Sequence, residues 1–213
     1  MRRTSFACLA LVLLAYAAAH WLTRDFQVWT AEGARRLEVA LHPVPAPRIA
    51  MDGPGLQGQT LQQVLLDEHA VTIVDFMYTR CITVCVALGS AFQQMQTAIA
   101  QGGQAPGAAP LRLMSISFDP AHDEPAVLAR FAESLHADSR VWSFARVAHA
   151  ADAQPLLAYY QVTVIADGMG GYEHNAALLV VDTDGRLVRV FEYAELVAAL
   201  DYARFLAGRR APP

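Results

Sequence analysis

Apolar and polar residues alternate in blocks along residues 71–206, and the spacing within each block predicts a regular order of strands and helices. Unbroken apolar runs bounded by turn residues are typical of buried strands, whereas apolar residues three and four positions apart indicate helices with one buried face. The predicted strands cover residues 71–78, 111–118, 141–147, 177–182 and 187–191, and the predicted helices cover residues 81–101, 125–136, 148–160 and 195–206.

The order of these elements predicts the fold class. The first two strands flank a long helix, which is the arrangement of a right-handed crossover between parallel strands. Asp184-Gly185 separates the last two strands and is a strong signal for a tight hairpin turn. A crossover followed by a C-terminal β-hairpin and a helix is the order of a thioredoxin-like domain. The glycine-rich stretch 161–175, before the hairpin, is expected to be a loop.

An uncharged apolar run, residues 6–19, follows Arg2 and Arg3 at the N-terminus. Basic residues before such a run keep that end in the cytoplasm and direct the remainder of the chain across the membrane. Two interpretations remain open: a retained anchor, which we favour, and a signal peptide cleaved after Ala17-Ala18-Ala19. Both place the folded domain on the extracytoplasmic (periplasmic) side. Cys8 precedes most of the run, a poor position for a lipid-modified cysteine, so we interpret it as a membrane residue.

Between the apolar run and the predicted domain lies a connector. Thr30 is a candidate cap for a short helix, while the alternation of apolar and polar residues over 37–42 hints at a strand. We expect an α/β fold: a thioredoxin-like domain with an N-terminal membrane segment and a C-terminal β-hairpin plus helix. The predicted divisions are residues 1–23 (membrane anchor or signal segment), 24–47 (linker), 48–208 (thioredoxin-like domain) and 209–213 (tail).

Composition excludes one class of partner. The formal net charge is −4, and the 16 basic residues, all of them arginine, are scattered along the chain. Binding to nucleic acid requires a clustered cationic surface, so we predict that this protein binds no nucleic acid.

The strongest chemical signal is a pair of cysteines, Cys81 and Cys85, directly after the first predicted strand. Residues four positions apart lie on one face of a helix. At a helix start the unpaired N–H groups and the helix dipole favour the thiolate form. Two adjacent thiolates can hold a soft metal or exchange electrons as a dithiol/disulfide pair. Zinc would require a fourth ligand, and the sequence offers none nearby.

Four stretches of this chain resemble the SCO/SenC family of copper chaperones, in the right order, over about residues 45–207. The resemblance rests on the spacing of the two cysteines behind an aromatic strand end, on an Asp-Pro loop, on a histidine before an apolar strand, and on the hairpin. These stretches are Phe76-x-Tyr78-Thr79-x-Cys81-x-x-x-Cys85, Ser115–Pro120 with Asp123-Glu124-Pro125, Tyr172-Glu173-His174-Asn175, and Asp182-x-Asp184-Gly185-Arg186.

The resemblance implies a membrane-anchored metallochaperone rather than an enzyme. It implies a copper ion, Cu(I) or also Cu(II), held by Cys81, Cys85 and His174. It further implies delivery of copper to the binuclear copper centre of cytochrome c oxidase, so the expected partner is the subunit with that centre or another exported copper protein. The sequence departs from the family pattern at Ile82 and Val86, where the family has a proline after each cysteine.

The main alternative is a thiol–disulfide oxidoreductase that uses Cys81 and Cys85 as its redox pair. Asp75 lies six positions before Cys81, which is similar to the thioredoxin pattern with a buried aspartate as proton acceptor. Both faces of this strand look apolar, so Asp75 should be costly unless it is hydrogen-bonded or protonated. The three-residue spacer between the cysteines is unlike the two-residue spacer of thioredoxins. A peroxidase-like role receives no specific support from the sequence.

Overall fold

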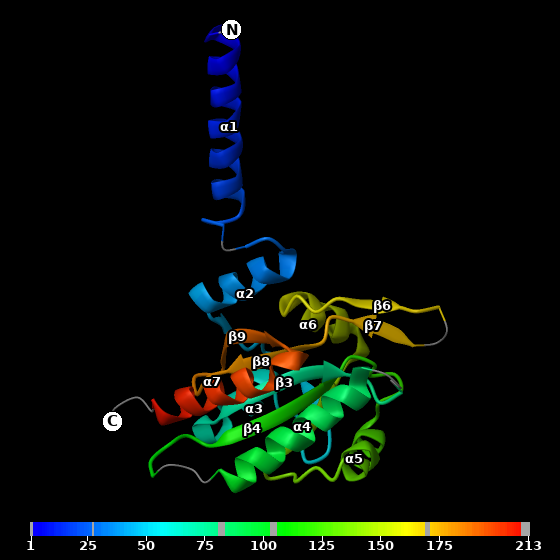
Figure 1. Cartoon of the computed structure of the whole chain (residues 1–213). Helices are drawn as coiled ribbons and strands as arrows, with labels where there is room; N and C mark the ends of the chain where they lie inside the picture. The colour runs from blue at the N-terminus through cyan, green and yellow to red at the C-terminus, as the bar shows by residue number, and fades with distance from the viewer. Residues whose placement is uncertain (1, 27, 81–83, 103–105, 169–170, 210–213) are drawn as a thin grey trace.

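The computed structural model describes residues 2–26, 28–80, 84–102, 106–168 and 171–209. An N-terminal helix projects from a mixed α/β domain (Figure 1). The helices are α1 (Arg2–Leu22), α2 (Ala31–Leu41), α3 (Leu61–Leu66), α4 (Val84–Gln101), α5 (Pro125–Ser134), α6 (Ala153–Tyr159) and α7 (Leu196–Gly208), with short 3₁₀ turns η1 (Asp67–His69), η2 (Ala150–Asp152) and η3 (Tyr193–Glu195). The strands are β1 (Val44–Pro45), β2 (Met51–Asp52), β3 (Val71–Met77), β4 (Leu111–Ser117), β5 (Trp142–Val147), β6 (Val164–Ala166), β7 (Tyr172–His174), β8 (Ala177–Val181) and β9 (Arg186–Glu192).

Seven of these strands form one sheet in the order β1-β9-β8-β3-β4-β5-β2. Strands β3, β4 and β5 are parallel, while β8 pairs antiparallel with β3 and β9 pairs antiparallel with β8. The predicted hairpin is confirmed, and Gly185 at its turn has a φ of +68°, a conformation that glycine adopts without strain. The fold class predicted from the order of elements is therefore confirmed.

Helices cover both faces of the sheet (Figure 1). On one face, Phe92 of α4 packs against Trp142 of β5, and Phe131 of α5 packs against Phe144 of the same strand. Helix α7 packs beside α4 across β3 and β4. On the other face lie α3 and the end of α6, where Tyr160 packs against Phe76 of β3. The central strand β3 is consequently buried along its whole length.

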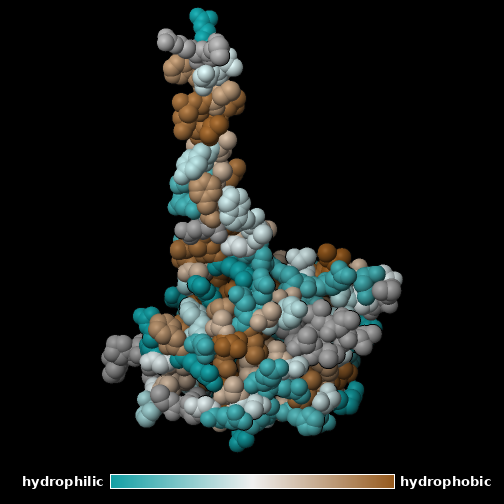
Figure 2. Space-filling view, viewed as in Figure 1, coloured by the Kyte–Doolittle hydropathy of each residue, from teal (hydrophilic) through white to brown (hydrophobic). Residues whose placement is uncertain are grey.

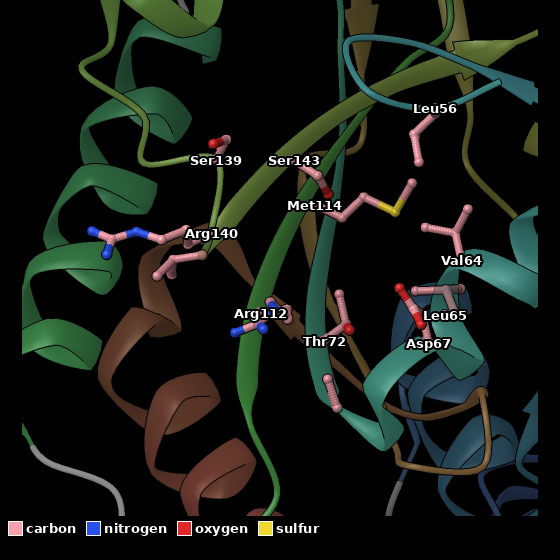
Figure 3. A pocket seen from close by; sticks show the side chains of 12 residues that line it. Leu56, Val64, Leu65, Asp67, Thr72, Arg112, Met114, Ser139, Arg140 and Ser143 are labelled. Carbon is pink, nitrogen blue, oxygen red and sulfur yellow. The ribbon is translucent and has the colours of Figure 1, made fainter.

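A pocket lies between α3 and the sheet (Figure 3). Val64 and Met114 line its apolar part, while Arg112 and Arg140 lie toward its other end. It lies at the end of the parallel strands where β3 and β4 begin, which is the end opposite to the cysteine segment.

Helix α1 has the length and composition of a membrane-spanning segment. Residues Arg3–Leu22 form an apolar helix, and none of this span is buried within the structure. Figure 2 shows this apolar helix standing clear of the more hydrophilic domain surface. A signal sequence has the same properties, so both interpretations of the N-terminus stay open. Cys8 lies exposed on this helix.

The strand suggested over residues 37–42 is wrong, because α2 (Ala31–Leu41) is a helix over most of this stretch. Thr30 caps it as predicted, accepting a hydrogen bond from the Gly33 N–H at 3.0 Å. Leu37 and Leu41 are four residues apart and also take part in the alternation with polar residues. So short a pattern fits both the helical period and the strand period. The helix is stabilised by contacts with β9, which the local pattern could not indicate.

The expected loop over residues 161–175 is also partly wrong. Strands β6 and β7 form a separate two-stranded antiparallel ribbon in this stretch, with Val164 opposite His174. The glycines Gly168 and Gly171 belong to the turn of this ribbon rather than to an open loop. His174 is therefore fixed on a strand.

Candidate metal-binding site

The cysteine segment lies at the junction of β3 and α4. Cys81 falls outside the described residues, and the described part of α4 begins at Val84, so the backbone of Cys85 belongs to the first turn of this helix. The predicted start of the helix, at Cys81, lies outside the described residues. The position of both sulfur atoms stays a prediction.

Asp123 holds the chain just before the cysteine segment. This fully buried carboxylate accepts hydrogen bonds from the backbone N–H of Thr79 at 3.0 Å, and from the hydroxyls of Thr79 and Ser117, both at 2.5 Å. Three donors satisfy the buried charge and fix the direction in which the chain leaves β3. The position of Thr79, two residues before Cys81, is therefore set by the loop after β4.

Arg80, the residue before Cys81, is held by the same loop. Its guanidinium donates to the carboxylate of Asp119 at 2.9 Å, and the ring of His122 lies 2.8 Å from the other carboxylate oxygen. In the sequence, Asp119 and Asp123 belong to the Asp-Pro loop that resembles the family, and an Asp-Pro pair at a strand end usually marks a turn. The structure instead makes both of them buried acceptors that bind the cysteine segment, and the Asp-Pro motif gave no signal for this role.

His174, the predicted third ligand, lies half-buried at the end of β7. Its ring packs edge-on against Phe118, with the ring centroids 5.2 Å apart. Both ring nitrogens are buried, and neither has a hydrogen-bond partner among the residues that the structure describes. Burial lowers the pKa of His174 below its usual value, so the neutral imidazole with its free lone pair is favoured.

Tyr78 connects this ribbon to the strand that leads to Cys81. Its hydroxyl accepts a hydrogen bond from the backbone N–H of Tyr172 at 2.9 Å and donates to the carbonyl of the same residue at 3.3 Å. Tyr78, Phe118 and Tyr172 also pack their rings together, with centroids 5.1 to 5.7 Å apart. Tyr78 is three residues from Cys81, and Tyr172 is two residues from His174. The fold thus brings the segments that precede Cys81 and His174, two predicted ligands far apart in sequence, into contact.

Asp75 is buried within β3, on the face covered by α4. Ser115, its register partner on β4, hydrogen-bonds to its carboxyl group and accepts a hydrogen bond from the indole N–H of Trp142 at 2.9 Å. The second carboxyl oxygen, Oδ1, has no partner in the described part of the chain. Burial raises the pKa of Asp75 to about 7, and the hydrogen bond from Ser115 only partly opposes this effect. Asp75 is therefore buried, as the apolar faces of the strand predicted, and it is hydrogen-bonded on one side.

The donor set matches a soft metal ion only when the cysteines are included. No cluster of three His, Cys, Asp or Glu side chains occurs within the described ranges, which omit Cys81 and the side chain of Cys85. A buried imidazole without a partner is the kind of group that a metal would satisfy. His174 therefore fits a ligand role, and none of the described carboxylates takes its place.

Comparisons with known proteins identify the family and the fold of this chain. The family model for SCO1/SenC matches residues 57–203. No curated protein matches the chain. Several solved structures share the fold. A SCO1/SenC family lipoprotein from Bacillus anthracis aligns with a TM-score of 0.66 and 17% identity, covering 78% of this chain and 98% of that one.

Two further structures have the same fold. Yeast Sco1 with copper bound aligns with a TM-score of 0.62 at 17% identity, covering 80% of this chain and 92% of that one. BsSco, described as a member of the Sco family of cytochrome c oxidase assembly proteins with a disulfide switch, gives 0.61 at 17% identity, with 78% and 96% covered. The family match spans more than half of the sequence and includes both cysteines and His174, and the chain belongs to the SCO1/SenC family.

Proposed function

We propose that this protein is a copper chaperone that binds copper through Cys81, Cys85 and His174 and delivers it to the binuclear copper centre of a respiratory cytochrome oxidase. One observation supports this most directly. The buried imidazole of His174 has no hydrogen-bond partner among the described residues, and Tyr78 ties its ribbon to the strand that precedes Cys81. Membership of the family and the copper bound to yeast Sco1 support the identity of the metal.

The residues fit copper as cargo. Thiolates are soft ligands that select Cu(I), and a neutral imidazole completes a three-coordinate site. The low pKa of His174 means that no proton has to be displaced from its ring near neutral pH. A disulfide between the two cysteines could not ligate Cu(I) in the same way, so the redox state of the pair would control loading. Cu(II) is the second oxidation state that imidazole nitrogen accommodates.

The proposed location is the extracytoplasmic face of a membrane, with α1 as the anchor. The apolar, unburied α1 supports this, as does the family lipoprotein among the solved structures. The proposed partner is the oxidase subunit that carries the copper centre, or another exported copper protein.

Metal analysis of the purified full-length chain tests the metal assignment. The reduced wild-type protein should hold about one copper ion per chain, as expected for a single three-ligand site. Cys81→Ser and Cys85→Ser should each lose this copper, and His174→Ala should bind it more weakly. Cys8→Ser and His136→Ala are matched controls that should keep it. Undiminished copper in Cys81→Ser would refute the proposal.

A second candidate function is thiol–disulfide exchange on exported proteins, and the state of Asp75 favours it. A buried carboxyl whose pKa is about 7 can accept a proton from a thiol near neutral pH. Metal-free protein would then reduce a disulfide substrate in a standard turnover assay, and Asp75→Asn would abolish most of that turnover. Absent turnover would leave the chaperone role alone, whereas equal turnover in the two proteins would show that Asp75 is not the proton acceptor.

A further inference from the structure

Helix α2, between the membrane anchor and the domain, is docked by a buried arginine. The side chain of Arg35 is 4% exposed and forms an ion pair with Glu32 at 2.9 Å. Its Nη2 donates to the backbone carbonyl of Tyr160 at 2.7 Å, across 125 residues of sequence. Figure 1 shows α2 beside α6, the helix that ends at Tyr159. A buried guanidinium is stable only when it is paired, so this contact fixes α2 against the end of α6.

The carbonyl that Arg35 holds belongs to the base of the ribbon that carries His174. Only three residues separate Tyr160 from Val164, which pairs with His174. Asn175 bridges this connection. It accepts from the Thr163 N–H at 2.7 Å through its side chain, and its side-chain amide donates to the Gln161 carbonyl at 3.3 Å. Hydrogen bonds and the backbone of residues 160–163 thus connect Arg35 to the ribbon that carries His174.

The position of the His174 imidazole depends on the backbone of the ribbon that these bonds hold. Metal-binding histidines are usually oriented by a hydrogen bond to the second ring nitrogen. Here neither ring nitrogen has such a partner in the described part of the protein. Packing against Phe118 and the backbone of the ribbon therefore place the ring. A shift at the base of the ribbon would therefore reach His174 through the backbone of the ribbon, against the ring packing with Phe118 and the bonds between Tyr78 and Tyr172.

We propose that Arg35 is a positioning residue for His174, so that the membrane-proximal helix α2 tunes copper binding. Helix α2 lies before the residues that the family model matches, so Arg35 contacts the matched region from outside it. The inference rests on the proposed function, because it assumes that His174 is a copper ligand.

The test compares two neighbouring arginines of α2 in the full-length protein. Arg35→Met removes the bond to Tyr160. Arg36→Met removes ion pairs with Glu32, Glu192 and Glu195 and leaves the bond between Arg35 and Tyr160 in place. Competition with a chromogenic Cu(I) chelator measures affinity. We expect Arg35→Met to weaken Cu(I) binding about tenfold, as changes behind a ligand do. Arg36→Met should bind like the wild type, and Arg35→Lys should recover part of the loss.

A double-mutant cycle shows whether the effect passes through His174. In a His174→Ala background, Arg35→Met should cause no further loss of affinity. A second readout needs no copper: amide hydrogen exchange over residues 164–166 and 172–174 should become faster in Arg35→Met and stay unchanged in Arg36→Met. If Arg35→Met does not fold, the same measurements are made on Glu32→Gln and Arg35→Lys.

The outcomes separate the two proposals. A wild-type protein that binds no Cu(I) would refute the proposed function. Wild-type binding with equal affinities for Arg35→Met and Arg36→Met would refute the positioning role alone. The positioning role is also refuted if Arg35→Met weakens binding equally with and without His174, because the effect would then be a general loss of stability.

Discussion

The hydroxyl of Tyr78 bonds to both the N–H and the carbonyl of Tyr172, at 2.9 and 3.3 Å. One side chain thus links the strand that leads to the cysteine pair with the ribbon that ends at His174. The two segments are 94 residues apart in sequence. Because the described ribbon shares no ladder with the main sheet, this link and the ring packing of Phe118 hold the two halves of the candidate site together.

Tyr78→Phe should loosen this link while keeping the ring packing against Phe118. Loss of the hydroxyl leaves the Tyr172 backbone groups without this partner, and we expect a stability loss of about 1 kcal/mol. Cu(I) affinity should fall about tenfold because His174 is less well placed. Chemical denaturation and chelator competition measure the two effects. Tyr193→Phe, at an exposed 3₁₀ turn, is the control and should change neither quantity.

Gly171→Ala should disturb the same link from the other side. An added Cβ would lie 3.1 Å from the Tyr78 hydroxyl and 2.5 Å from a carboxylate oxygen of Asp167, so both side chains would have to move. We expect faster amide exchange in the ribbon and weaker Cu(I) binding. Gly208→Ala introduces its methyl group where no other described element lies within 4 Å, and it should leave both measurements unchanged. Equal behaviour of the two variants would contradict the expected contact.

Asp123→Ala should destabilise the whole domain. It removes a buried acceptor of three hydrogen bonds and leaves the Thr79 N–H and the Ser117 hydroxyl without their acceptor. Losing such a network costs about 2–4 kcal/mol, which a urea titration resolves. Glu133→Ala, an exposed carboxylate on the following helix, provides the matched control. A midpoint shift no larger than that of Glu133→Ala would show that the Thr79 segment is held by other contacts.

Asp75 should make stability fall as pH rises. Its pKa is raised from 3.8 to about 7 by burial, so between these pH values the folded protein binds more protons than the unfolded chain. The free energy of unfolding therefore decreases as pH rises through this window. Above the window it is lower than at pH 4 by an amount on the order of a few kcal/mol. Asp75→Asn should be more stable than the wild type at pH 8, with the difference disappearing near pH 4. Parallel pH profiles for the two proteins would contradict the buried, raised-pKa carboxyl.

The order of elements could be predicted from sequence because β3, β4 and β8 are buried on both sides. Such strands are mostly apolar in sequence, and Asp184-Gly185 marks the turn of the hairpin. The short ribbon of β6 and β7 could not be predicted, since its exposed residues carry no burial pattern and are held by the bonds of Tyr78 and Asn175. Secondary structure that depends on distant partners leaves little local signal.

The candidate site was predictable to a similar extent. Cys81, Cys85 and His174 could be proposed from spacing and resemblance, and the fold brings the segments around them together. The roles of Asp123 and Arg35 could not be inferred. Asp-Pro motifs usually mark turns, and a guanidinium on a short amphipathic helix usually points into solvent. Only the tertiary contacts with Thr79 and Tyr160 distinguish these side chains from ordinary surface residues.

The separation of the β6–β7 ribbon from the seven-stranded sheet has a consequence for release of the cargo. Lifting the ribbon breaks its bonds to Tyr78 but no rung of the main sheet, so this excursion requires far less energy than global unfolding. Of the three proposed ligands, the imidazole of His174 could dissociate first while both cysteine sulfurs stay bound to the copper ion. A vacant coordination position would then open toward an incoming acceptor, and the ion could pass between proteins without ever being free in solution.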